Sequence, residues 1–366
     1  MENKKNELYN IINNIEKSDK NIMDEAKERM DSLAKPLGSL GELEKIGIKI
    51  TGITGSLKNK FKKKCVIIFC ADNGVFEEGV ASTPQYVTVA QTINFTKGLS
   101  GVGVIAKENG SDLMIVDIGI NSSLQIEGVI DRKIRRGTNN IAKGPAMTED
   151  ECIQAILTGI EASKKAYDEG YDVLGVGEMG IGNTTTSSSV LIALKECDIE
   201  AAVGRGSGLT NDAFNKKKMV IKKALEINKP NKDNPIDILM KVGGFDLAAM
   251  TGAFIGASYY KIPIVIDGFI SVVAALLAVK LNENIKDYLF ASHLSQEIGY
   301  SLAINELGLK PMVNLDMRLG EGSGCPIAFS IIDTANAILR NMATFEESGI
   351  NCEYLDEIRD EECYKI

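Results

Sequence analysis

The chain has 366 residues, of which 44% are hydrophobic and 25% are charged, and this composition excludes a disordered, collagenous or membrane-spanning protein. Fifty acidic against 41 basic residues give a formal net charge of −9, which argues against a nucleic-acid partner. No apolar run approaches the roughly 20 residues of a membrane span, so we also expect no membrane partner. The length predicts two domains or one large α/β unit.

Cysteine and histidine usage narrows the chemistry further. The seven cysteines form no C-x-x-C pair and have no histidine cluster nearby, and the charged first residues lack the apolar segment of a secretion signal. Both features predict a protein of the reducing cytoplasm. His293 is the only histidine, which makes a multi-histidine zinc site impossible and leaves a Ser-His-Asp triad dependent on that one residue. We therefore expect no bound metal.

Both ends of the chain have helical patterns. Residues 1–60 are predicted to form polar helices, with Leu8, Ile11, Ile12 and Ile15 on one face. Helical periodicity returns after about Thr334 and the chain ends in an acidic tail. We predict a small helical domain of residues 1–60 with 334–366, and a large α/β catalytic domain of residues 61–333.

The predicted large domain contains short apolar runs that each end in small or polar residues. These runs cover residues 65–70, 113–118, 173–176, 264–266 and 289–290. Such runs are typical of parallel strands buried on both faces. Helical segments alternate with them, the clearest beginning at a capping box formed by Thr148 and Glu151. The alternation predicts an α/β fold with a doubly wound, mostly parallel sheet that has helices on both faces and a ligand crevice beyond the carboxyl ends of its strands.

A glycine-rich turn follows the predicted strand at residues 173–176. Gly175 to Gly180 fit the pattern G-x-G-x-x-G, and Ile181-Gly182-Asn183-Thr184 continue into a predicted helix. Backbone N–H groups at such a helix start bind phosphate, although the same glycines also suit a tight strand-to-helix turn. Glu178 lies inside this turn, where an unpartnered buried carboxylate would be costly.

Three further segments are candidates for the crevice. Val203-Gly204-Arg205-Gly206-Ser207, followed by Lys216-Lys217-Lys218, fits an anion pocket, although a basic run is also typical of a solvated helix face. Asp267 ends a strand and should face the crevice. His293 is interpreted as a structural histidine with satisfied hydrogen bonds.

The most specific local pattern surrounds Glu321. Gly320, Gly322 and Gly324 flank this lone carboxylate, so its backbone can approach a ligand closely. The pattern predicts a general base. The alternative is a glycine-rich surface loop with an incidental acid.

The order of these motifs carries a resemblance that no single motif does. Over roughly residues 30–348 the chain resembles the nicotinate-nucleotide:dimethylbenzimidazole phosphoribosyltransferase family. The matching segments are Lys35–Gly41, Ala71–Val75, Glu78–Val80, Gly177–Thr185, Val203–Gly206, Asp267–Phe269, Ala291–His293 and Arg318–Gly322. The chain departs from the family at Asn73, where histidine is common, and at Gly299-Tyr300, where Gly-His is common. The departure at Asn73 leaves the acceptor base open.

The resemblance implies a fold and an activity. It implies a homodimer with a Rossmann-like large domain and a small domain built from both chain ends, with no metal or organic cofactor. It further implies a glycosyltransferase that moves phosphoribose from nicotinate mononucleotide to 5,6-dimethylbenzimidazole or a related base. The products would be α-ribazole 5′-phosphate, for the lower ligand of cobalamin, and nicotinate.

The resemblance also implies roles for individual residues. Glu321 is the catalytic base and takes a proton from the acceptor. Glu178 or Asp267 would stabilise positive charge on ribose or hold its hydroxyl groups. We expect the acceptor to contact Thr83, Gln91, Met317 and Leu319. We expect the donor, through its phosphate above all, to contact Gly180, Ile181, Gly182, Asn183, Thr184, Gly206, Ser207 and Lys217. Ser292 is a further predicted substrate-binding residue.

Two other functions remain open at this point. An NAD-dependent oxidoreductase would need Glu196 or Asp198 at the end of a second strand, whereas residues 190–194 fit the end of a helix better. A non-catalytic nucleotide-binding regulator would keep the glycine clusters without needing Glu321.

Overall fold

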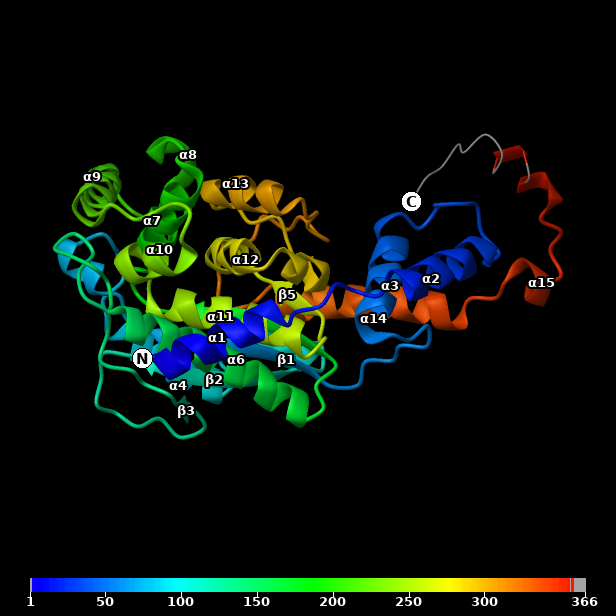
Figure 1. Ribbon diagram of the computed structural model, residues 1–366, viewed down its shortest axis with the longest axis horizontal. Helices are drawn as coiled ribbons and strands as arrows, with labels where there is room; N and C mark the ends of the chain where they lie inside the picture. Colours follow the sequence, from blue (N-terminus) through cyan, green and yellow to red (C-terminus); the bar gives the residue numbers. More distant parts are fainter. Residues whose placement is uncertain (1, 356, 359–366) are drawn as a thin grey trace.

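The computed structural model describes residues 2–355 and 357–358, and it is built around one parallel sheet (Figure 1). Its strands are β1 (Lys64–Ala71), β2 (Asp112–Gly119), β3 (Ile130–Asp131), β4 (Val173–Met179), β5 (Ile264–Ile266) and β6 (Leu289–Ala291). Their order in the sheet is β3-β2-β1-β4-β5-β6. This is the Rossmann strand order: β2 and β3 are added on one side of β1, and β4, β5 and β6 are added on its other side. The predicted fold class is confirmed.

The five predicted strands are present because each is apolar on both faces. In β1, every residue after Lys64 is buried. β3 was not predicted, since it has only two residues and neither is buried. The capping box at Thr148 and Glu151 is present at the start of α6, as predicted.

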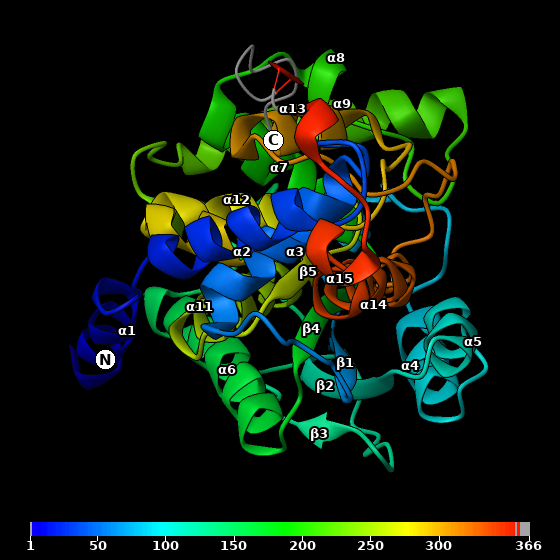
Figure 2. The same cartoon turned by 90° about the vertical axis from the view of Figure 1, so that its right-hand side faces the viewer.

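Helices cover both faces of the sheet. Within the described residues they are α1 (Glu2–Asn13), α2 (Lys20–Ser32), α3 (Glu42–Thr54), α4 (Val87–Thr96), α5 (Gly101–Glu108), α6 (Glu149–Asp168), α7 (Asn183–Lys195), α8 (Ile199–Ala202), α9 (Asn211–Asn228), α10 (Pro235–Val242), α11 (Phe245–Tyr259), α12 (Phe269–Leu281), α13 (Ile298–Leu307), α14 (Cys325–Asn341) and α15 (Phe345–Ser348), with 3-10 turns η1 (Gly74–Glu78), η2 (Glu283–Tyr288) and η3 (Glu353–Leu355). Figure 2 shows α6, α11 and α12 on one side of the sheet and α4, α5 and α14 on the other.

A second group of helices extends from the sheet (Figure 1). Helices α2 and α3 pack with the far end of α14 around a separate apolar cluster that includes Met30, Leu33 and Leu339. Helix α1 lies instead against α6 and α11, and α14 runs from the sheet into the second group. The domain division at residues 61 and 333 stays a prediction. Its last part, residue 356 with residues 359–366, is outside the described residues.

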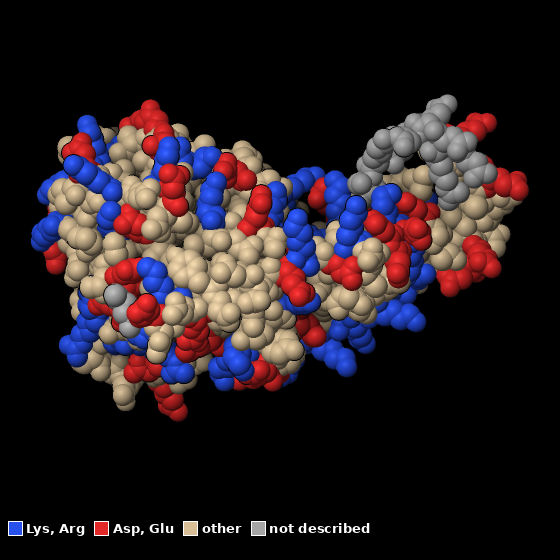
Figure 3. All heavy atoms as spheres, in the orientation of Figure 1, with Lys and Arg blue, Asp and Glu red and all other residues tan. Residues whose placement is uncertain are grey.

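The surface carries mixed charge, and Figure 3 shows Lys and Arg interspersed with Asp and Glu over one face. None of the helices in the described part of the chain is both long enough and apolar enough to cross a membrane.

Candidate active site

A cavity of about 700 Å³ opens beyond the carboxyl ends of β1, β4, β5 and β6. The residues after β1 contribute Thr83 and Gln91, while β4 and its turn contribute Gly177 to Thr184. Asp267 follows β5 and His293 follows β6. The cavity therefore lies where the sheet reverses its strand order, the position at which open α/β sheets bind their ligands.

The loop that carries Glu321 has an unusual backbone. Glu321 has φ +66°, between Gly320 at +83° and Gly322 at +89°. A left-handed conformation costs a residue with a side chain roughly 1 kcal/mol or more, so the surrounding structure must enforce it. Gly177 of β4 permits the loop to approach, because a Cβ atom there would collide with the Glu321 carbonyl oxygen. One glycine of the G-x-G-x-x-G pattern thus serves close packing inside a strand.

Hydrogen bonds hold the Glu321 carboxylate in place. Its Oε1 accepts from the Gln91 side-chain amide at 2.5 Å, and its Oε2 accepts from the backbone N–H of Val102 at 3.1 Å. Gln91 is on α4, and Val102 is in the first turn of α5. The carboxylate is buried but lines the cavity, so it is positioned to accept a proton from a bound ligand.

Asp267 fixes the same loop from the other side. Its two carboxylate oxygens accept from the backbone N–H groups of Gly322 at 3.0 Å and Gly324 at 2.7 Å. Burial raises the pKa of Asp267 to about 7, against the opposing effect of these two bonds. Both oxygens already have backbone donors, which gives Asp267 a role in positioning Glu321.

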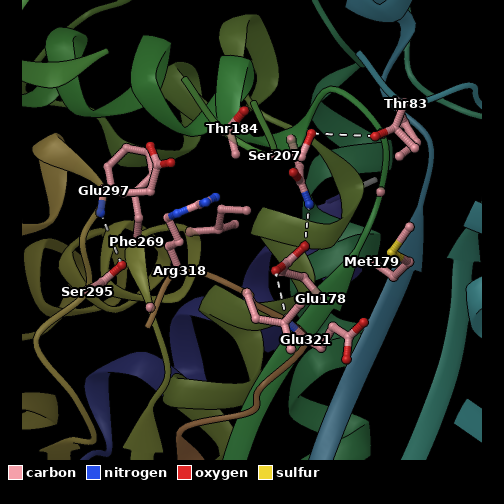
Figure 4. Close-up of a pocket in the computed structure, with 18 of the residues that line it drawn as sticks. Thr83, Glu178, Met179, Thr184, Ser207, Phe269, Ser295, Glu297, Arg318 and Glu321 are labelled. Atoms are coloured by element: carbon pink, nitrogen blue, oxygen red, sulfur yellow. Dashed lines mark hydrogen bonds between the residues drawn. The ribbon is translucent and has the colours of Figure 1, made fainter. Parts of the chain in front are cut away.

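Glu178 completes a cluster of buried acids (Figure 4). Its Oε2 accepts from the Asn183 side-chain amide, and its Oε1 accepts from the backbone N–H of Glu321 at 3.4 Å. Burial, together with the negative charges of Asp246 and Asp267, raises the pKa of Glu178 well above its ordinary value. A cationic ligand would reverse this effect, so the cluster favours a substrate that carries or develops positive charge.

The corner beside α7 has the features of an anion site. Gly182 precedes α7 with φ +96°, and no side chain caps the helix. The Asn183 and Thr185 N–H groups donate to the Gly180 and Gly182 carbonyls, so the Thr184 N–H is the one in this turn that has no hydrogen-bond partner in the described part of the chain. Thr184 and Ser207 line this corner. The buried Lys217 amine donates to the Thr184 hydroxyl at 2.9 Å and to the Gly204 carbonyl at 3.0 Å, and burial lowers its pKa to about 8.

The opposite side of the cavity is lined by Phe269, His293, Ser295, Glu297 and Arg318, here called the Phe269 lobe. His293 was expected to be fully satisfied. The Ser292 hydroxyl donates to the Asp267 carbonyl, so the His293 Nδ1–H donates to Ser292 Oγ at 2.9 Å. Nε2 has no hydrogen-bond partner within residues 2–355 and 357–358. Burial lowers the pKa of His293 to about 4, which leaves the imidazole neutral.

The structure brings most of the predicted site residues to one cavity. Those that line it are Thr83, Gln91, Glu178, Gly180, Ile181, Gly182, Asn183, Thr184, Gly206, Ser207, Asp267, Leu319 and Glu321. Three others do not: Lys217 lies behind Thr184, Ser292 is buried beneath Asp267, and Met317 accepts a bond from Gln296 through its carbonyl. Asn73 is also buried away from the cavity, where its amide donates to Asp246 at 3.4 Å.

Several lining residues were missed by sequence reasoning. Ser295 and Glu297 follow the end of β6, so the strand-end rule that selected Asp267 also applies to them. Phe269 and Arg318 belong to the segments Asp267–Phe269 and Arg318–Gly322, from which only Asp267, Leu319 and Glu321 were selected as site residues. The Val102 N–H group carries no sequence signal, because any residue at that position except proline supplies the same donor.

The described residues contain no group of three or more His, Cys, Asp or Glu side chains arranged to hold a metal ion.

The oxidoreductase alternative lacks the second strand that it requires before its acidic residue. Residues Asn183–Lys195 form α7, Glu196 caps the end of that helix, and Asp198 caps the start of α8.

Fold and cavity together define an α/β enzyme with a Rossmann-like sheet and an acid-lined small-molecule site. A family model described as phosphoribosyltransferase matches residues 15–350, and the chain belongs to this family.

Proteins named nicotinate-nucleotide–dimethylbenzimidazole phosphoribosyltransferase are similar over nearly the whole chain. The protein from Clostridium perfringens (strain ATCC 13124) is 59% identical over 98% of this chain and 99% of its own length. That from Clostridium tetani is 48% identical over 96% and 98%. A solved structure of that name from Thermus thermophilus is 36% identical, with a TM-score of 0.86 over 91% of this chain and 99% of the other.

Proposed function

We propose that the chain transfers phosphoribose from nicotinate mononucleotide to 5,6-dimethylbenzimidazole or a related aromatic base. The products are α-ribazole 5′-phosphate, for the lower ligand of cobalamin, and nicotinate. The observation that carries the proposal is the Glu321 carboxylate, which faces the cavity and is held by the Gln91 amide and the Val102 N–H. The names of the similar proteins support the same reaction.

The leaving group needs no acid catalyst. Nicotinate mononucleotide holds its pyridine as a cationic N-glycoside, so when the C1′–N bond breaks, the electron pair returns to the ring nitrogen and nicotinate departs with that nitrogen neutral. This chemistry agrees with a site whose one histidine is neutral at pH 7.

The acceptor needs a base. One imidazole nitrogen forms the new bond to C1′ while the other, which carries the proton, becomes acidic as positive charge builds on the ring. Glu321 takes that proton and passes it to solvent when the product leaves. Its two donors keep the carboxylate oriented before the acceptor arrives.

The ribose passes through a state with positive charge at C1′. Glu178 lies between the Glu321 loop and Asn183. The positive charge of the bound donor favours the ionised form of Glu178, whose negative charge then stabilises the developing cation. The donor phosphate rests on the uncapped start of α7 and on Gly206 and Ser207, with Lys217 as the charge partner behind Thr184.

We also propose that the protein acts as a cytoplasmic homodimer. Leu99, Val104 and Leu319 are exposed, and Leu319 lines the cavity mouth. Exposed apolar side chains beside a site are suited to cover by a second copy. Light scattering on the purified protein measures the oligomeric state directly, and a monomeric mass at micromolar concentration would contradict the homodimer.

The function is tested by incubating the protein with nicotinate mononucleotide and a panel of bases: 5,6-dimethylbenzimidazole, benzimidazole, adenine and a phenol. We expect nicotinate release only when a base is present, with a nucleotide product of matching mass. Release without any base, or no release with every base, would contradict the proposal. Adding a chelator should leave the rate unchanged, since no step uses a metal.

A further inference from the structure

The side chain that holds Glu321 is itself held by a residue behind it. Gln91 donates from its amide nitrogen to Glu321 Oε1 at 2.5 Å, and its amide oxygen accepts from the Asn94 side-chain amide at 3.1 Å. Asn94 follows Gln91 by three residues on α4, a spacing that places both side chains on one face of the helix. Asn94 does not line the cavity that the described residues form. The three side chains are therefore one chain of hydrogen bonds that ends at the proposed base.

The backbone of Asn94 is fixed by the turn between α4 and α5. Its carbonyl oxygen accepts from the backbone N–H groups of Lys97 at 3.2 Å and of Leu99 at 2.9 Å. Helix α5 begins just after this turn and supplies the Val102 N–H, the second donor to Glu321. Asn94 thus contacts, through its side chain and its carbonyl, the two segments that hold the carboxylate.

The orientation of the Gln91 amide matters because its two ends differ in hydrogen-bonding character. The NH₂ group is attracted to a carboxylate, whereas the carbonyl oxygen is repelled by one. Holding a long, flexible side chain in one conformation also costs entropy, which the two hydrogen bonds of Gln91 offset. A donor at its oxygen and a carboxylate at its nitrogen together favour the orientation that is observed.

We propose that Asn94 is a positioning residue for the reaction: it holds the Gln91 amide with its NH₂ group toward Glu321, and so keeps the carboxylate oriented for the acceptor proton. The inference rests on the proposed function. It adds a residue that contacts neither substrate and acts through Gln91. Loss of Asn94 should slow proton removal and leave donor binding unchanged, because the donor contacts are on other loops.

Two substitutions of similar size test the role of Asn94. Asn94→Leu removes the donor, so kcat should fall about 3- to 10-fold, the usual effect of one neutral hydrogen bond. Asn94→Asp should lower kcat further, because the new carboxylate repels the Gln91 oxygen and attracts its NH₂ group away from Glu321. The donor KM should stay within about twofold of the parent in both variants. An unchanged kcat in both, or a rise in donor KM that matches the fall in kcat, would overturn the proposal.

Thr96→Val is the matched control. It removes a hydrogen bond from the same turn of α4, in which the Thr96 hydroxyl donates to the Ile93 carbonyl at 2.9 Å, and it leaves Gln91 untouched. Its kcat should equal that of the parent. A loss as large as that of Asn94→Leu would mean that any weakening of this turn slows the enzyme, and would overturn the assignment.

A double-variant cycle shows whether Asn94 acts through Gln91. In Gln91→Met the amide is absent, so adding Asn94→Leu should change kcat by less than about twofold. Independent effects that multiply in the double variant would give Asn94 a purely structural role and contradict the proposal.

A binding measurement separates this inference from the proposed function. Benzimidazole and benzoxazole have the same shape, but benzoxazole has a ring oxygen in place of the N–H group that Glu321 would accept. Calorimetric titration with each compound needs no turnover. The wild type should bind benzimidazole more tightly, and Asn94→Asp should reduce this preference. An equal ratio of the two affinities in wild type and variant would overturn the role of Asn94, whereas a reduced ratio without turnover would contradict only the reaction.

Discussion

The two sides of the cavity differ in how their polar groups are satisfied. On the Glu321 side, both oxygens of Glu321 and both oxygens of Asp267 already accept hydrogen bonds from the protein. In the Phe269 lobe, Glu297 Oε2 is buried without a hydrogen-bond partner among the described residues, and Arg318 is exposed. A catalytic group gains from being oriented before the reaction, while a recognition group is completed by its ligand. The Glu321 side is therefore the part of the cavity whose acidic groups are oriented by the protein before any ligand arrives.

Replacing Glu321 tests the chemical side most severely. Glu321→Gln keeps the size of the side chain and one acceptor oxygen but cannot take a proton. We expect kcat to fall about 10²- to 10⁴-fold, equivalent to about 3–5 kcal/mol of barrier. Nicotinate release at saturating substrates measures this.

Donor affinity and the melting temperature serve as controls for that variant, since the phosphate contacts are on other loops. Turnover within a few-fold of the parent would show that Glu321 is not the base and would break the comparison between the two sides.

The lysine pair on α9 sharpens the comparison at the phosphate corner. Lys217 is buried against Thr184, whereas its neighbour Lys216 is exposed. Lys217→Met should raise the donor KM about 10- to 100-fold, because a hydrogen bond to a charged group is worth about 1.5–3 kcal/mol. Lys216→Met should have little effect.

The KM values for donor and acceptor, measured separately in both lysine variants, test whether Lys217 acts on the donor phosphate. A rise confined to the acceptor KM, or an equal rise in both lysine variants, would place the phosphate elsewhere.

The smallest expected effect concerns Asp246, a buried acid that accepts a hydrogen bond from the Asn73 side chain. Burial raises the pKa of Asp246 to about 6, above its ordinary value of 3.8. Between these two values the folded state holds a proton that the unfolded state has released, so the free energy of unfolding falls as pH rises from about 4 to 6.

Asp246→Asn should therefore stabilise the protein by about 1–3 kcal/mol at pH 8 and by almost nothing at pH 4. The new amide has an acceptor available, because Asn73 Oδ1 is buried without a hydrogen-bond partner. Melting temperatures at the two pH values measure the effect. A variant less stable than the parent at pH 8 would mean that the ionised carboxylate is needed by its neighbours.

Much of the fold could be predicted because its signals are local. The apolar runs that became β1, β2, β4, β5 and β6 are contiguous in sequence, and the capping box at Thr148 spans four residues. Helix α1 has the expected apolar face, with Leu8 and Ile12 buried. That α1 packs on α6 and α11, apart from α2 and α3, was not predictable, since an amphipathic face does not specify its partner.

The sequence by itself determined the parallel sheet, the strand ends that carry Glu178 and Asp267, and the glycine-flanked Glu321. Each of these depends on residue types within a few positions of one another. Only the tertiary structure decided that the Val102 N–H and Gln91 hold Glu321, that Asp267 braces the Glu321 loop, and that Arg318 is left without a hydrogen bond in the described part of the chain. These contacts join residues as many as 230 positions apart. They depend on how the strands order themselves in the sheet, and no local pattern encodes a distance of that kind.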